Sequence, residues 1–297
     1  MRPSLSIIIP SLNEGYATQK TVSNIIDTIG LENYEIIVIN SGGTEILAIK
    51  DLPMVRLYDT PREGAPQARN FGATNASSKF LLFADAHLEF RQNWGNTILN
   101  DLENNQTSII TPCVTVMNDY NSRGCGFRWK NINMEIEWFP DVKNELHEIP
   151  FACGCCMAVE KNTFIQIGQF DSGTRMWSEE DSEICMRTWL LGCSVLCDPS
   201  VKVGHNFKTS FPYEVKWMDL NYNKIRFLFS HFNSQRLTTY LTALSQASNF
   251  TETLLMVLKD NVLNRRKELD EKRIHDDNWF FEKFKMRDWS DSFNDNT

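Results

Sequence analysis

Residues 79–89 constrain the fold more than any other stretch of this sequence. One lysine precedes Phe-Leu-Leu-Phe-Ala at residues 80–84, an apolar run without helical spacing that predicts a strand buried on both faces. An acid and an imidazole, Asp85 and His87, follow directly. Because side chains alternate along an extended chain, we expect both to point the same way, at the strand end where open α/β sheets bind ligands. Alternatively, the two polar residues only mark the place where the strand ends and the chain reaches solvent, and the pair alone does not exclude this.

Similar apolar runs alternate with helical patterns before this strand, and this alternation predicts the fold class. The expected elements are strands over 5–10, 35–39, 54–58 and 79–84, with helices over 18–29 and 65–76. A β-α-β-β-α-β succession with short crossovers predicts an α/β fold with a largely parallel, doubly wound sheet. Later expected elements are helices over 94–102 and 182–191 and strands over 108–112, 157–159 and 195–196. Residues 118–140 are rich in Asn, Gly and aromatics and receive no assignment.

The pattern changes to helices after residue 207. We expect helices over 215–232, 237–247 and 249–272, the last with a capping box formed by Asn249 and Glu252. The tail after His275 carries interleaved aromatic and acidic residues, which favours packing on the main body or on a partner subunit. The sequence therefore predicts a domain over 1–207 and a helical extension over 208–297, which is packed on that domain and could form a homo-oligomer contact.

Composition narrows the class of protein. The formal net charge of -8 argues against a general nucleic-acid binder, which would carry a basic surplus. The apolar run near the N-terminus is too short for a signal peptide, and no stretch reaches membrane-spanning length. We therefore expect a cytoplasmic protein whose eight cysteines stay reduced as small buried residues. Cys153-Gly154-Cys155-Cys156 lacks a paired Cys-x-x-Cys framework, so a redox or zinc protein is a distant alternative.

Several ordered motifs resemble the nucleotide-sugar-dependent glycosyltransferases of GT-A fold, especially glycosyltransferase family 2. They are residues 6–14 (SIIIPSLNE), the strand and turn at 35–45, residues 64–73 (GAPQARNFGA), the Asp85/His87 pair and residues 177–187 (WSEEDSEICMR). Asp-x-His and the segment Val203-Gly204-His205-Asn206-Phe207 are similar to the polypeptide N-acetylgalactosaminyltransferases. The resemblance covers roughly residues 4–207 and implies a GT-A domain in which His205 joins Asp85 and His87 as metal ligands.

The resemblance also implies a cofactor and a donor site. Two imidazoles and one carboxylate suit Mn²⁺ better than Mg²⁺, although Mg²⁺ stays an alternative, and the donor would be a UDP-sugar. The residues implied in binding this donor are Pro10, Ser11, Glu14 and Asn40 for uridine, Arg69 for the nucleotide, Asp85 through the metal, Gly154 beside the sugar and Trp177 as a sugar or acceptor platform. Family relatives usually have an acidic pair where this chain has Asn40-Ser41, and Trp177 also fits a core position.

Glu180 and Asp181 carry the expected chemistry. In inverting family 2 enzymes an acid at this place resembles a general base that deprotonates the acceptor hydroxyl, and we assign that role to Asp181. Both acids also suit the N-terminus of the following helix, where negative charge is favourable. The predicted function is transfer from a UDP-sugar to a hydroxyl of a saccharide, peptide or protein. The alternatives are a retaining peptide Ser/Thr glycosyltransferase and a non-catalytic nucleotide-sugar-binding subunit.

Overall fold

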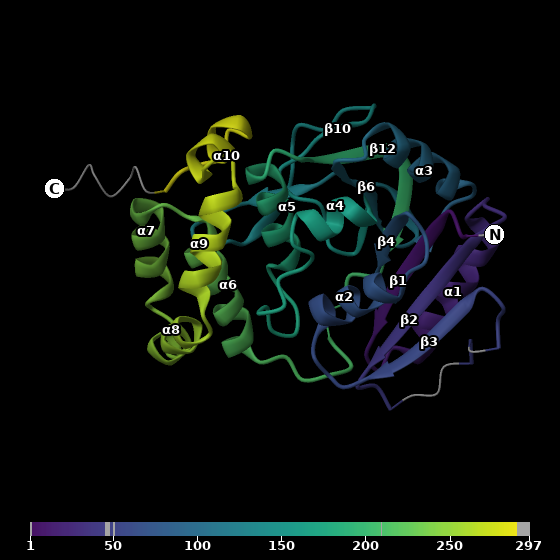
Figure 1. Ribbon diagram of the computed structural model, residues 1–297, viewed down its shortest axis with the longest axis horizontal. Helices are drawn as coiled ribbons and strands as arrows, with labels where there is room; N and C mark the ends of the chain where they lie inside the picture. Colours follow the sequence, from purple (N-terminus) through teal and green to yellow (C-terminus); the bar gives the residue numbers. More distant parts are fainter. Residues whose placement is uncertain (1, 45–47, 50, 209, 290–297) are drawn as a thin grey trace.

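The computed structural model describes residues 2–44, 48–49, 51–208 and 210–289. Within these ranges the chain forms a ten-stranded mixed sheet and a two-stranded sheet, with helices on both faces of the larger one (Figure 1). The strands are β1 (Leu5–Ser11), β2 (Tyr34–Ser41), β3 (Val55–Thr60), β4 (Phe80–Ala84), β5 (Leu88–Phe90), β6 (Ser108–Val116), β7 (Asp119–Gly124), β8 (Phe127–Trp129), β9 (Ile136–Trp138), β10 (His147–Glu148), β11 (Cys156–Glu160) and β12 (Ser194–His205). The helices are α1 (Gly15–Thr28), α2 (Ala65–Asn75), α3 (Trp94–Asn104), α4 (Lys161–Gln166), α5 (Glu180–Leu190), α6 (Trp217–His231), α7 (Ser234–Leu244), α8 (Phe250–Lys259), α9 (Val262–Lys272) and α10 (Asp277–Lys283).

The predicted parallel sheet is confirmed, and an antiparallel strand divides it. The main path runs β10-β12-β6-β11-β4-β1-β2-β3. Strands β3, β2, β1 and β4 are parallel neighbours, and β12 and β6 are also parallel. Strand β11 is antiparallel to both β4 and β6. All five residues of β4 are buried, as the continuous apolar run predicts for a central strand covered on both faces.

Two apolar clusters cover the two faces of the sheet, because neighbouring strand residues point to opposite sides. Ile7 and Ile9 belong to the cluster that includes α1 and α3, and Ile8 belongs to the cluster that includes α2 and α5. The second cluster continues without interruption into α6, α7 and α10. The C-terminal helices therefore pack on the sheet-bearing part of the chain, and Figure 1 shows them gathered at the end of the molecule opposite β1–β3.

The C-terminal helices differ from the sequence prediction at two points. The single helix expected over 249–272 is divided into α8 and α9, which meet where Asn261 has a left-handed φ of 61°. The break allows the side chain of Asp260 to accept hydrogen bonds from Tyr222 and Arg175. The expected capping box is also wrong, because Asn249 makes no side-chain cap bond and its Oδ1 accepts from Asn221 instead.

The aromatic tail packs on the main body. Phe280 and Phe281 of α10 are buried, and Phe281 contacts the ring of Trp129 from β8. The acidic residue Asp277 is buried as well, where its carboxylate pairs with Arg236 of α7. Phe293 lies outside the described residues. In the part of the chain that the structure describes, none of the helices has the length and apolarity needed to cross a membrane.

Candidate active site

A cavity of about 320 Å³ opens at the carboxyl ends of β1, β4 and β12. Open α/β sheets bind their ligands at this edge. Nine of the residues assigned from the sequence line it: Pro10, Ser11, Glu14, Arg69, Asp85, His87, Trp177, Glu180 and His205. The structure thus brings together side chains from distant parts of the sequence, whereas Asn40, Gly154 and Asp181 do not line the cavity wall.

Asp85, His87 and His205 form the metal-capable cluster that the sequence predicts. One ligand atom of each lies within 4.8 Å of the others. The reason that Asp85 and His87 converge differs from the expectation: β4 ends at Ala84, so Asp85 lies just beyond the strand and His87 in the turn that follows, not in an extended strand. His205 ends β12 and pairs in register with Leu88, the first residue of β5, so the antiparallel β5–β12 pairing delivers the third ligand.

Glu14 orients the first histidine of the cluster. Its Oε2 accepts a hydrogen bond from His87 Nδ1 at 2.8 Å and lies 2.5 Å from Lys208 Nζ. Burial alone would raise the pKa of the Glu14 carboxyl, but His87 and Lys208 outweigh that effect and hold the pKa below its ordinary value. Because Glu14 takes Nδ1, the other ring nitrogen of His87 is left to face the cluster, as in metal sites whose histidines are fixed by a carboxylate.

Asp85 is held as a carboxylate by its neighbours. Burial favours the neutral acid, but His205, Arg69 and His87 together outweigh it and keep the pKa of Asp85 well below its usual range. Its Oδ2 lies 3.7 Å from His205 Nε2, and its Oδ1 accepts from Arg69 at 2.9 Å. His205 Nδ1 is buried without a protein hydrogen-bond partner among the described residues. The cluster therefore offers one anionic oxygen and two imidazoles with free nitrogens.

Arg69 ties the cluster to the start of α5. Its guanidinium donates to Asp85, to Glu180 at 3.0 Å and to the carbonyl oxygen of Gly154 at 3.0 Å, and the residue is only 3% exposed. Burial alone would lower the pKa of Arg69, yet the two carboxylates reverse the shift and raise it. The sequence assigns Arg69 to the nucleotide. The structure places it at the cavity wall, where both terminal nitrogens bond to protein oxygens and the buried Nε has no hydrogen-bond partner among the described residues.

This arrangement makes Arg69 a large contributor to stability. Replacing Arg69 with alanine leaves the buried carboxylate of Glu180 and the half-buried one of Asp85 without their shared cation, so we expect the free energy of unfolding to fall by about 3–5 kcal/mol. Urea denaturation measures the change. Arg128→Ala is the matched control, because the Arg128–Glu137 pair is partly exposed and should be worth about 0–1 kcal/mol. Equal losses in the two variants would contradict the bridging role.

Asp181 follows the cavity-lining residue Glu180, is half-buried and is not itself among the lining residues. Its Oδ2 accepts from the backbone N–H of Gly154 at 3.1 Å, and its Oδ1 accepts from the N–H of Ser182 at 2.8 Å. Burial, reinforced by the negative charge of Glu180, raises the pKa of Asp181 to about 7. Gly154 therefore links Asp181 to Arg69 through its two backbone groups.

Of two further residues assigned to the donor site, Trp177 lines the cavity and Asn40 does not. Asn40 donates to Asp59 at 2.7 Å and to the carbonyl of Gly43, and Ser41 occupies the cavity wall in its place. Trp177 does line the cavity, and its ring lies 5.2 Å from that of Phe211.

Sequence reasoning did not assign Lys208, although it lines the cavity beside Glu14. The usable signal was a cation three residues after the proposed ligand His205 in the sequence. All eight cysteines are free, and within the described ranges the side chains that could hold a metal are those of Asp85, His87 and His205, with no cysteine among them.

An open, mostly parallel sheet with an Asp/His/His cluster at its strand ends has the architecture of a GT-A glycosyltransferase. Residues 6–168 match the model described as Glycosyl transferase family 2, so the chain belongs to that family. Residues 128–209 match a second model, described as the N-terminal domain of galactosyltransferase.

Curated relatives and solved structures agree with this assignment. The chain is 29% identical to polypeptide N-acetylgalactosaminyltransferase 11 of Xenopus tropicalis over 240 residues (71% of this chain, 39% of the relative) and 28% identical to human polypeptide N-acetylgalactosaminyltransferase 10 over 237 residues (72% and 39%). It thus spans about two-fifths of the length of these relatives. A crystal structure of GalNAc-T7 with UDP, GalNAc and Mn²⁺ has a TM-score of 0.74 at 20% identity and covers 95% of this chain and 56% of that one. Staphylococcus aureus TarS in complex with UDP-GlcNAc has a TM-score of 0.59 at 12% identity, covering 90% and 83%.

Proposed function

We propose that this protein transfers a sugar from a UDP-sugar to a hydroxyl acceptor in a reaction that depends on a divalent metal ion. The observation that carries the proposal is the Asp85/His87/His205 cluster in the wall of the strand-end cavity. The two structural relatives support the donor class, because one was crystallised with UDP, GalNAc and Mn²⁺ and the other in complex with UDP-GlcNAc.

The cluster fits Mn²⁺. One carboxylate oxygen and two imidazole nitrogens form a mixed donor set. Such a set suits Mn²⁺, whereas Mg²⁺ and Ca²⁺ prefer sites made of oxygen atoms alone. The fixed orientation of His87 and the approach of His205 Nε2 to within 3.7 Å of Asp85 Oδ2 agree with a site built for ligation. A bound divalent cation would neutralise charge on the departing nucleoside diphosphate. Lys208 adds a further positive charge at the same wall.

The remaining wall residues fit a nucleoside diphosphate. Pro10, Ser11 and Ser41 come from the ends of β1 and β2 and offer the uridine a surface of small side chains and a hydroxyl. Arg69 acts by fixing Asp85 and Glu180 at the correct places. Trp177 offers an aromatic face against which the apolar face of a sugar could pack.

For the chemical step, we propose that Asp181 is the general base and that the reaction inverts the anomeric configuration of the donor sugar. A carboxylate with a pKa of about 7 is well matched to removing a proton from an acceptor hydroxyl near neutral pH. Glu180, held by Arg69, would lie next to the reacting centre and support the oxocarbenium character of the transition state.

A retaining peptide Ser/Thr glycosyltransferase is the second candidate. It is favoured by the names of the two curated relatives, which are polypeptide N-acetylgalactosaminyltransferases. The configuration of the anomeric carbon in the product, read by NMR, distinguishes it from the inverting reaction. A cytoplasmic location, the domain boundary at residue 207 and homo-oligomerisation through the C-terminal helices stay predictions.

A screen of UDP-sugars with Mn²⁺ tests the function. We expect UDP release with at least one donor, abolished by EDTA, followed by a mass increase of one sugar on a saccharide, peptide or protein acceptor. Tight UDP binding without transfer or hydrolysis for any donor would instead favour a non-catalytic nucleotide-sugar-binding subunit.

The orienting role of Glu14 gives a prediction about metal affinity. Glu14→Ala removes the partner of His87 Nδ1, and we expect Mn²⁺ affinity to fall by about 10- to 100-fold, as when other metal sites lose the group that orients a ligand. Isothermal titration with Mn²⁺ measures it. Glu32→Ala, which removes a glutamate outside the cavity, is the control and should bind Mn²⁺ as the parent does. Unchanged affinity in Glu14→Ala would refute the orienting role.

A further inference from the structure

The loop over residues 175–179 brings two side chains to the cavity. Its backbone adopts a conformation that other parts of the protein must stabilise. Met176 and Trp177 line the cavity, and the loop ends where Glu180 begins α5. Met176, Ser178 and Glu179 have φ values of 48°, 89° and 64°. Residues with side chains adopt such left-handed backbone only where surrounding contacts hold it. The loop therefore depends on its neighbours for its shape.

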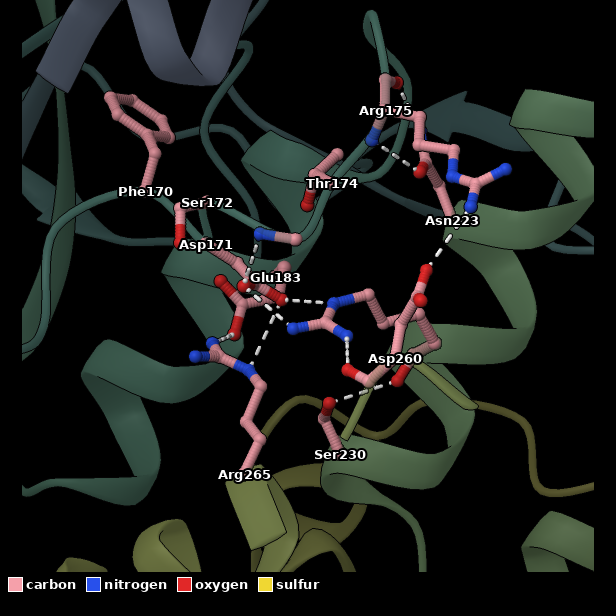
Figure 2. A network of polar contacts seen from close by, with 12 residues as sticks. Phe170, Asp171, Ser172, Thr174, Arg175, Glu183, Asn223, Ser230, Asp260 and Arg265 are labelled. Carbon is pink, nitrogen blue, oxygen red and sulfur yellow. Dashed lines mark hydrogen bonds and ion pairs between the residues drawn. The ribbon is translucent and has the colours of Figure 1, made fainter. Parts of the chain in front are cut away.

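Asn223 of α6 provides contacts of this kind through a single side chain. Its Nδ2 lies 2.8, 2.9 and 3.1 Å from the carbonyl oxygens of Arg175, Trp177 and Ser178. Its Oδ1 accepts from the backbone N–H of Arg175 at 2.8 Å. Figure 2 shows Asn223 facing the backbone of Arg175. The residue is 3% exposed, so water cannot readily replace these bonds.

The opposite side of the same loop rests on the start of α2. The backbone N–H of Ala65 donates to the carbonyl of Met176 at 2.7 Å. Gly64 approaches so closely that a Cβ there would lie 2.8 Å from the Cα of Met176. The loop is thus clamped between α2 on one side and Asn223 of α6 on the other.

Ion pairs anchor the chain just before this loop to the C-terminal helices. Asp171 pairs with Arg226 of α6 at 2.7 Å and with Arg265 of α9 at 3.1 Å. Arg265 also reaches Glu183 of α5 at 2.6 Å, and Figure 2 shows these groups together. These pairs fix the ends of the segment, whereas Asn223 bonds to the left-handed part itself.

We propose that Asn223 is a positioning residue, which holds residues 175–179 so that Trp177 and Glu180 face the cavity. Asn223 does not line the cavity and acts through the loop backbone. A residue of the C-terminal helices would in this way control the geometry of the transfer site. The kinetic consequence rests on the proposed function; the structural consequence does not.

Asn223→Ala tests the proposal by hydrogen exchange and by kinetics. The N–H groups of Arg175 and Glu183 should exchange at least about tenfold faster, because the first loses its acceptor and the second bonds to Glu179 in the freed loop. Turnover for UDP release should fall by about 10- to 100-fold, since displacement of the site by about 1 Å has that effect. Mn²⁺ affinity should stay unchanged, because the metal-capable cluster belongs to other elements.

Two further variants keep the test decisive. Asn223→Asp preserves shape and the acceptor for Arg175 but points a carboxylate oxygen at three carbonyls, so it should also free the loop. Asn221→Ala, on the same helix, removes a bond to Asn249 and should change neither loop exchange nor turnover.

Unchanged loop exchange in Asn223→Ala and Asn223→Asp, or the same changes in Asn221→Ala, would overturn the proposal. If no donor supports transfer in the parent protein, the proposed function fails while the exchange experiment still decides the role of Asn223.

Discussion

His205→Ala is expected to reduce Mn²⁺-dependent UDP release by about 100- to 1000-fold while leaving the protein folded. A bound divalent ion contributes several kcal/mol of transition-state charge stabilisation, and each 1.36 kcal/mol corresponds to about a factor of ten in rate. Removal of His205 takes one of the three ligand groups away. The fold should tolerate it, because His205 Nδ1 has no protein partner to leave unpaired and Asp85 keeps its bond to Arg69.

A metal titration and two further variants make this result specific. Isothermal titration should show Mn²⁺ affinity at least about 100-fold weaker, since loss of a ligand itself exceeds the effect of losing a group that orients one. Asp85→Ala should lose activity as well. His275→Ala is the control, because that histidine stacks on Trp279 of α10 and is not part of the cluster. Full UDP release by His205→Ala and Asp85→Ala in the presence of EDTA would end the metal hypothesis.

The central strands were predictable because their signal is local. Strands β1, β2 and β4 are nearly continuous apolar runs, and their short lengths of 7, 8 and 5 residues favour a strand buried on both faces over a buried helix. Strand β12 was predicted over two residues but extends over twelve, since its pattern mixes buried and exposed positions and shifts register between Asp198 and Lys202. Strands β7–β9 lie in the unassigned Asn-rich segment, where tertiary pairing decides the structure.

The metal-capable cluster was predictable for a different reason. Asp85 and His87 sit two residues apart after a recognisable strand, and the family resemblance supplied His205. The contacts around the cavity were not predictable from the sequence, because they join distant parts of the chain. They are the bonds from Arg69 to Glu180, from Lys208 to Glu14 and from Asn223 to the 175–179 loop. Asn40 is a case in which the sequence suggested too much. Its position matched that of a nucleoside-binding residue, but its side-chain amide donates to Asp59 instead.

Asp181→Asn is expected to lower turnover by about 100- to 10,000-fold, the usual contribution of a general base, with little change in donor affinity. An asparagine cannot accept the acceptor proton, yet it keeps the size of the side chain and an oxygen for one of the two N–H groups of Gly154 and Ser182. Steady-state kinetics with the best UDP-sugar gives turnover, and titration with UDP and Mn²⁺ gives donor affinity. The variant therefore separates chemistry from binding.

The pH profile and the product complete the argument about Asp181. The base works only when deprotonated, so with a pKa of about 7 turnover should rise as pH increases through that value and level off above it. Asp181→Asn should lose this rise. Glu179→Gln is the control, because Glu179 is the adjacent acid but is not the group bonded to Gly154. A product that retains the donor's anomeric configuration would refute Asp181 as the base of an inverting reaction, since inversion requires the acceptor oxygen to attack from the face opposite the leaving diphosphate.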